Sequence, residues 1–216
     1  MVVELTRNNS VLNRFVAELR DQHIQKDPLR FRRNLERVGE VMAYELSRTL
    51  DYREQETVTP LGVTTTQVPA QLPVLATILR AGLPLHQGLL NYFDGAECAF
   101  ISAYRKHRKG EDGFDIEVEY LSSPSLEDRV LVISDPMLAT GRSMVMVQRA
   151  LQRLGKPKAL HIVSVIASSE GIAYLKSHVP PDTRIWVGAV DEEMTAQAYI
   201  VPGLGDAGDL AFGVKL

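Results

Sequence analysis

Cysteine is nearly absent from this chain of 216 residues, which contains a single one, Cys98. One cysteine excludes a disulfide scaffold and a zinc site built from cysteines, and it fits a reducing compartment. Cys98 lies in an apolar stretch, so we interpret it as a core thiol and not as a nucleophile. The five histidines show no metal-ligand spacing either. The chain therefore offers no residue pattern for a structural metal site.

An excess of charge of one sign is also missing, because 24 Lys and Arg face 27 Asp and Glu for a net charge of −3. A protein that mainly holds nucleic acid carries a basic surplus, so we expect no nucleic-acid partner. No stretch approaches the ~18 apolar residues of a membrane span, and the first ten residues contain no apolar run typical of a signal peptide. With 45% hydrophobic residues the chain can still form a core. We expect a cytoplasmic globular protein without a membrane partner.

Helical patterns open the chain, and strands then alternate with helices. Ser10 can cap a first helix, and Asp27-Pro28 predicts the start of a second one that ends near Leu50. Residues 51–72 mix Thr, Gln, Pro and Gly and are expected to form a loop with a short strand or two. Expected strands follow at 73–79, 96–104, 116–121, 129–134, 159–168 and 184–190, and expected helices at 83–93, 143–155 and 168–178. Apolar strands between helices predict an α/β fold with a parallel sheet covered on both faces.

Three loops follow expected strands, and ligands bind at the carboxyl ends of strands in an open parallel sheet. The middle one, residues 135–143 (DPMLATGRS), leads from a carboxylate at the strand end to Thr-Gly-Arg-Ser at the start of a helix. Backbone N–H groups of such a turn, with the hydroxyls of Thr140 and Ser143, can cradle a phosphate monoester. It is not a P-loop, because GxxxxGK[ST] is missing. An ordinary capped turn between strand and helix is the alternative.

The other two loops and two charge clusters are less specific. Arg80 directly follows an apolar strand and can offer a guanidinium to an anion, although a solvated arginine in a tight turn has the same pattern. The basic run 105–109 is either a solvated hairpin face or an attraction for a polyanion. The turn 202–208 places three glycines around Asp206, which is a weak signal alone. We interpret the acidic cluster 191–193 as a solvated loop.

Taken together, four motifs resemble the signature set of uracil phosphoribosyltransferases in order and spacing. They are ILRAG at 78–82, YR at 104–105, DPMLATG at 135–141 and YIVPGLGDAGD at 199–209. The resemblance implies a type I phosphoribosyltransferase fold over residues 1–216 as a single domain: a parallel sheet flanked by helices, with N-terminal helices and a small hood over the base site. It also implies the family reaction, in which uracil and 5-phosphoribosyl 1-diphosphate (PRPP) give UMP and diphosphate. Mg²⁺ would be carried by the PRPP diphosphate, with no metal site of the protein's own.

The resemblance also implies roles for single residues. Asp135 would hold the ribose hydroxyls, and Arg80 and Arg105 would bind the diphosphate; with Asp206 these are the candidate catalytic residues. The residues expected to contact PRPP are Arg80, Arg105, Asp135, Pro136, Met137, Leu138, Ala139, Thr140, Gly141, Arg142, Ser143 and Asp206. The residues expected to contact uracil, largely through backbone groups, are Ile200, Gly205, Asp206 and Ala207. Asp206 is also a candidate acceptor for the proton of uracil N1.

Arg142 departs from the family pattern, which has glycine at this position of the phosphate turn. Arginine with a positive φ is strained, so we expect a negative φ and a place in the first turn of the following helix. Its side chain then either extends into solvent or contacts a phosphate or an allosteric ligand.

Two alternatives to an active enzyme remain open from the sequence. A regulatory RNA-binding protein that senses pyrimidines on the same fold would need a basic face, whereas basic and acidic residues are interspersed here outside the run 105–109. A relative that binds nucleotide without turnover is suggested only by Arg142. The resemblance further implies GTP as an effector and a homodimer or homotetramer.

Overall fold

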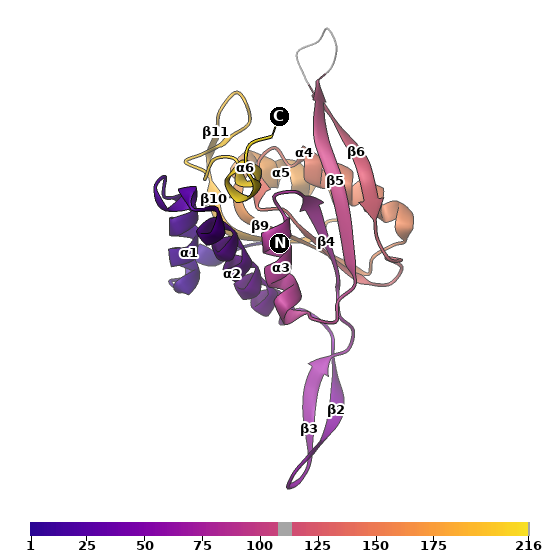
Figure 1. Ribbon diagram of the computed structural model, residues 1–216. Coiled ribbons are helices and arrows are strands. Elements are labelled where there is room, and N and C mark those ends of the chain that lie inside the picture. Colours follow the sequence, from indigo (N-terminus) through magenta and orange to yellow (C-terminus); the bar gives the residue numbers. More distant parts are fainter. Residues whose placement is uncertain (108–113, 216) are drawn as a thin grey trace.

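The computed structural model describes residues 1–107 and 114–215, and within strands β5 and β6 it describes residues 103–107 and 114–118 by their backbone alone (Figure 1). Among the helices of this part of the chain, none is long and apolar enough to cross a lipid bilayer.

A mixed sheet of eight strands forms the centre of the protein, with the order β1-β10-β9-β7-β4-β5-β6 and with β8 paired to β9. The strands are β1 (Val2–Glu4), β4 (Val74–Leu79), β5 (Cys98–His107), β6 (Phe114–Ser122), β7 (Val130–Ser134), β8 (Met137–Leu138), β9 (Ala159–Ser168) and β10 (Arg184–Asp191). Every described pairing in this sheet is parallel except that of β5 with β6. The predicted parallel sheet is confirmed, with an antiparallel strand at one edge and the unpredicted β1 at the other.

Helices cover both faces of the sheet, as predicted. They are α1 (Val11–Arg20), α2 (Pro28–Ser47), α3 (Leu83–Tyr92), α4 (Arg142–Leu151), α5 (Ser169–His178) and α6 (Ala207–Phe212), with short 3₁₀ turns at Leu5–Arg7, Ile24–Lys26 and Gln152–Leu154. Successive residues of β7 point to opposite faces: Val130 and Val132 pack with α1, α2 and α3, whereas Leu131 and Ile133 pack with α4 and α5. The near-continuous apolar runs of the central strands follow from this double coverage.

The caps of the two N-terminal helices agree with the sequence. The Ser10 hydroxyl accepts a hydrogen bond from the backbone of Leu12 at 3.2 Å. The Asp27 carboxylate accepts from Leu29 and Arg30, and Pro28 occupies the first helical position. The second helix ends at Ser47, slightly before the predicted end.

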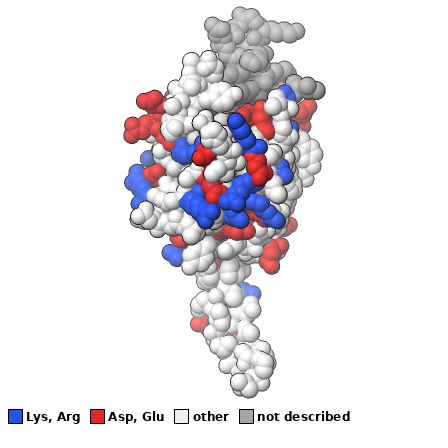
Figure 2. Space-filling view, turned by 60° about the vertical axis from the view of Figure 1, so that its left-hand side comes forward, with Lys and Arg blue, Asp and Glu red and all other residues white. Residues whose placement is uncertain are grey.

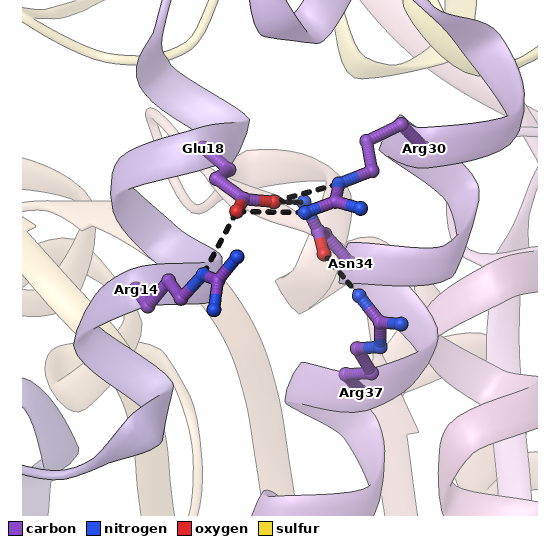
Figure 3. A network of polar contacts seen from close by, with 5 residues as sticks. All are labelled: Arg14, Glu18, Arg30, Asn34 and Arg37. Carbon is purple, nitrogen blue, oxygen red and sulfur yellow. Dashed lines mark hydrogen bonds and ion pairs between the residues drawn. The ribbon is translucent and has the colours of Figure 1, made fainter.

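A polar network joins α1 to α2 (Figure 3). Arg30 donates two hydrogen bonds of 2.8 Å to the Glu18 carboxylate, and Asn34 adds a third of 2.8 Å. These donors hold the pKa of Glu18 at about 2, well below its usual value, against the opposing effect of burial. The network therefore holds α1 and α2 together.

Residues 51–72 were expected to form a loop with a short strand or two. In the structure they form a regular hairpin of two eight-residue strands, β2 (Tyr52–Thr59) and β3 (Gly62–Pro69). The hairpin extends away from the rest of the protein (Figure 1) and is mainly uncharged in the space-filling view (Figure 2). Polar Thr and Gln residues, exposed on both faces, hide the alternation that marks a half-buried strand.

After β10 the chain forms a small hood from β11 (Glu193–Met194), β12 (Ile200–Val201) and α6. The hood lies at the end of the molecule to which β4 points (Figure 1). Helix α6 packs on α2, where Arg32 donates a hydrogen bond of 2.7 Å to the carbonyl of Ala211. The N-terminal helices thereby support the hood.

Candidate active site

A cleft of about 500 Å³ opens between the carboxyl ends of the strands and the hood. The segments that line it are the turn after β4, the 135–143 loop, the 197–208 segment of the hood and the chain end at Lys215. Its place is the one expected for a ligand in an open parallel sheet.

The 135–143 loop forms the floor of the cleft and leads into the N-terminus of α4. Gly141 has a φ of +74° and precedes the helix, and a Cβ at this position would lie 2.8 Å from the carbonyl oxygen of Gly171. Only glycine fits both conditions. From the other side, the Ser168 hydroxyl donates to the carbonyl of Ala139 at 2.6 Å, which fixes the loop to the start of α5. The first turn of α4 is thereby held beside the cleft, where its backbone N–H groups can bind an anion. The Arg142 N–H already donates to the Thr140 hydroxyl at 3.4 Å.

Asp135 and Asp206 place two carboxylates in the wall of this cleft. Burial raises the pKa of Asp135 to about 7; the backbone N–H of Met137 opposes this rise, and the charge of Asp206 adds to it. Asp206 is itself fixed, because its Oδ1 accepts hydrogen bonds from Gly208 at 2.9 Å and Asp209 at 3.0 Å at the start of α6. The pair therefore forms a site where a cation or hydroxyl donors would be stabilised.

The residues that the sequence singled out are largely brought together. Those that line the cleft are Asp135, Met137, Leu138, Ala139, Thr140, Gly141, Ser143, Gly205, Asp206 and Ala207. Pro136 and Ile200 are buried beside it. The side chain of Arg105 lies outside the described part of the protein, as does most of the basic run 105–109.

Two arginines do not line the cleft. Arg80 turns toward the chain end, where it meets Asp209 at 3.5 Å and donates to the carbonyl of Gly213 at 3.1 Å. Its side chain is 43% exposed, so these contacts are weak. Arg142 is the first residue of α4 and has no positive φ, which confirms the backbone prediction, and its side chain is exposed.

Several lining residues were missed by sequence reasoning. Lys215 is the only cationic side chain among the described residues that line the cleft, and Gln197, Ala198 and Tyr199 close the hood over it. A lysine directly before the last residue of the sequence has no local pattern that predicts such a role. Tyr199 directly precedes Ile200, a predicted uracil contact, and this position in the sequence was the one signal that could have identified it.

The donor set fits Mg²⁺ that arrives with a ligand. Among the residues that the structure describes, no group of three or more His, Cys, Asp or Glu side chains could hold a metal alone. Mg²⁺ commonly binds through one or two carboxylates together with substrate phosphates and water. Asp135 and Asp206, whose charges repel each other across the cleft, provide that number of carboxylates.

Comparison with known proteins agrees with this geometry. The model of the uracil phosphoribosyltransferase family matches residues 6–214. The chain belongs to the uracil phosphoribosyltransferase family. A uracil phosphoribosyltransferase from Porphyromonas gingivalis is 55% identical over 215 residues, covering 100% of this chain and 99% of the relative. One from Thermococcus gammatolerans is 39% identical over 204 residues, covering 93% and 88% of the two chains.

Solved structures confirm the type I phosphoribosyltransferase fold expected for the family. The AQ2163 protein from Aquifex aeolicus superposes over 100% of both chains with a TM-score of 0.88 and 29% identity. A hypoxanthine phosphoribosyltransferase from Staphylococcus aureus covers 74% of each chain with a TM-score of 0.51 and 16% identity, and it supports the fold alone. The likeness to this purine enzyme extends over the shared part of the sheet and its helices.

Proposed function

We propose that this protein transfers the 5-phosphoribosyl group of PRPP to N1 of uracil, giving UMP and diphosphate. Family membership over the full chain supports this function. The observation that carries it is the cleft, in which a phosphate-type loop at the start of α4 faces a hood built from backbone turns. A nucleotide-forming reaction needs both parts within one cavity.

The donor would bind along the 135–143 loop. The 5′-phosphate accepts hydrogen bonds from the N–H groups at the start of α4 and from the hydroxyls of Thr140 and Ser143. Asp135, at the end of β7, faces the position of the ribose hydroxyls. Lys215 adds a positive charge to the lining of the cleft, which favours binding of the anionic donor.

The chemical step requires stabilisation of the leaving diphosphate more than a nucleophilic side chain. As the bond from C1 to the diphosphate breaks, the ribose develops oxocarbenium character and the leaving group gains negative charge. Arg80 can bind the leaving diphosphate, because its exposed contacts with Asp209 and Gly213 are easily exchanged for contacts with diphosphate oxygens. Arg105 is proposed for the same role from the family motif. Asp135 and Asp206 would hold Mg²⁺ that arrives with the donor, and the chemistry that such an ion would supply is neutralisation of the leaving charge.

The base would bind under the hood. Uracil presents alternating carbonyl oxygens and N–H groups along one edge, and backbone groups of Ile200, Gly205 and Ala207 can pair with them. Bound in this way, uracil N1 is held in line with C1 of the ribose, which is a task of positioning. Asp206, at the same turn, is the proposed acceptor for the N1 proton.

Three further expectations belong to the same proposal. A homodimer or homotetramer is supported by the projecting hairpin β2–β3, whose apolar tip residues are exposed. A cytoplasmic location is supported by the single cysteine and by phosphorylated substrates. GTP as an effector rests on family membership alone.

Direct measurement of UMP and diphosphate tests the function. Purified protein with PRPP, Mg²⁺ and labelled uracil should form both products in equal amounts. Hypoxanthine in place of uracil serves as the control base, since a structural relative acts on it. Absence of UMP under these conditions, or equal turnover of hypoxanthine, would overturn the proposal. A salt-dependent RNA titration with no specific binding would further separate the enzyme from the regulatory alternative. On the face shown in Figure 2, basic and acidic side chains are interspersed.

A further inference from the structure

An ion pair with a buried carboxylate joins helix α1 to the end of strand β10. Asp191 is the last residue of β10 and is only 7% exposed. Arg20, the last residue of α1, donates from both terminal nitrogens to the two carboxylate oxygens of Asp191, each at 2.8 Å. The sequence prediction of a solvated loop at 191–193 is thus wrong for Asp191, because its partner lies 171 positions earlier in the chain.

The same two side chains hold both backbone groups of Gly203. Arg20 Nη1 donates to the Gly203 carbonyl at 3.0 Å, and the Gly203 N–H donates to Asp191 Oδ2 at 3.2 Å. Gly203 has a φ of +59°, and a Cβ there would lie 2.1 Å from the carbonyl oxygen of Ile200. The backbone is therefore tightly folded at the residue to which the ion pair is hydrogen-bonded.

Gly203 lies in the middle of the segment that closes the cleft. Tyr199 precedes it and Gly205 and Asp206 follow it, and all three line the cleft. Its neighbours Ile200 and Leu204 are buried in the core, at 4% and 2% exposure. A displacement of Gly203 would move the groups on both sides of it, which are those proposed to contact uracil.

We propose that Arg20 and Asp191 are positioning residues that fix the 199–208 turn in the conformation that binds the pyrimidine base. This inference rests on the proposed function. Recognition through backbone groups leaves no side chain to adjust, so the backbone must be held in place before the ligand arrives. The ion pair bonds the 199–208 turn directly at Gly203. It meets the 135–143 loop only through Ser168, the register partner of Asp191 on β9, which binds Ala139. Its larger effect should therefore fall on the base.

A purely structural role is the alternative, and the chain contains a matched control for it. The pair of Glu18 with Arg30 also has two hydrogen bonds of 2.8 Å, and it also joins α1 to another element (Figure 3). Glu18 is 11% exposed at its side chain and Asp191 is 7% exposed, so the two carboxylates are similarly buried. The Glu18 pair makes no described contact with the 199–208 turn. Loss of either pair lowers stability, but only one loss should alter the base site.

The experiment compares Asp191→Asn with Glu18→Gln in the full-length protein. We expect Asp191→Asn to raise KM for uracil about tenfold, a loss of ~1.4 kcal/mol, while KM for PRPP, which depends on this turn only through Asp206, rises by a clearly smaller factor. Glu18→Gln should lower the Tm and leave both KM values unchanged. Hydrogen exchange of the ligand-free proteins gives a second readout: amides of 199–208 should exchange faster in Asp191→Asn than in the wild type or in Glu18→Gln.

The outcomes separate the two proposals. If wild-type protein forms no UMP, the proposed function fails, and the exchange comparison alone then decides whether the ion pair fixes the turn. Unchanged KM for uracil in Asp191→Asn, or equal changes in both KM values, would overturn the inference, as would unchanged exchange in 199–208. If Asp191→Asn does not fold, Arg20→Lys retains the charge but not the planar fork, and it should raise KM for uracil by a smaller factor that the same measurement resolves.

Discussion

The partly buried carboxylate of Asp135 lowers the stability of the fold, although the proposed reaction requires its charge. Burial raises its pKa to about 7, so near neutral pH the folded protein holds a carboxylate whose charge is poorly solvated. Because the pKa in the unfolded chain is near 4, the folded protein binds a proton that the unfolded chain has released between about pH 4 and 7. This group therefore lowers the free energy of unfolding as the pH rises through that window. Such a position is typical of a functional residue.

We expect Asp135→Asn to lose activity without losing stability. The variant removes charge-assisted hydrogen bonds to the ribose, so kcat/KM should fall by ~1.5–3 kcal/mol of transition-state stabilisation, or about 10- to 200-fold. At pH 8 its Tm should equal or exceed that of the wild type, because the desolvated charge is gone. Steady-state kinetics and thermal unfolding test both parts. Near-full kcat/KM would show that Asp135 is only structural.

The same pKa predicts how donor binding depends on pH. The ionised form of Asp135 is the one that accepts hydrogen bonds from ribose hydroxyls and favours a nearby cation, so KM for PRPP should fall as the pH rises from about 6 to about 8. PRPP titrates as well, and Asp135→Asn provides the correction, since it retains only the ligand's own dependence. Parallel pH profiles for the wild type and the variant would contradict the assignment.

Arg142 is expected to contribute little to donor binding. Its backbone takes the first position of α4 and its exposed side chain does not line the cleft, so the solvated alternative is the one that the structure favours. Arg142→Gly should change KM for PRPP by less than about twofold at both low and high ionic strength. A tenfold increase in KM that disappears at high salt would instead show that the side chain reaches the phosphate.

At the scale of elements, sequence patterns predicted most of the sheet and its helices but not all of the contacts between them. Apolar runs such as 130–134 were identified because burial on both faces leaves a strong local signal. The hairpin β2–β3 was expected only as a loop with a short strand or two, because strands exposed on both faces leave no apolar alternation that would show their full length. The Arg20–Asp191 pair was missed for another reason: no local pattern links two charged residues so far apart in the chain.

The candidate site, too, contains parts that the sequence predicted and parts that it did not. The 135–143 loop and the 199–208 turn were predicted because their geometry depends on local residues, above all on glycine. The position of Lys215 and the turn of Arg80 toward Asp209 depend on how the chain end packs, which no local pattern describes.

The hood predicts the choice of base. Uracil offers O4 as an acceptor and N3–H as a donor, and cytosine reverses both, so backbone groups held by the 199–208 turn would be left unpaired against cytosine. We expect kcat/KM for uracil to exceed that for cytosine by up to ~10⁴-fold. Competition between the two bases in one assay measures the ratio. Comparable values would show that side chains able to adapt, and not the fixed turn, recognise the base.

At the scale of the whole molecule, the hairpin β2–β3 has no evident function within one copy of the chain. It extends from the body (Figure 1) and exposes Val58, Leu61 and Val63 at 83%, 100% and 65%. An exposed hairpin on its own is marginally stable, and two isolated strands normally need further packing to persist. Contact with a second copy of the chain would supply that packing and bury the apolar side chains.

Neighbouring positions on β3 allow a matched test of this assembly. Val58 and Val63 are cross-strand partners, and Thr57 and Thr64 form the next pair, on the opposite face of the hairpin. We expect sedimentation to show a dimer or tetramer for the wild type, dissociation for Val63→Asp, and an unchanged assembly for Thr64→Asp, because only the first variant places a charge on the apolar face. A wild-type monomer at micromolar concentration, or equal effects of the two variants, would show that the hairpin does not carry the interface. Since the hairpin lies at the end of the molecule opposite the hood, dissociation should leave KM for uracil unchanged, in contrast to loss of the Arg20–Asp191 pair.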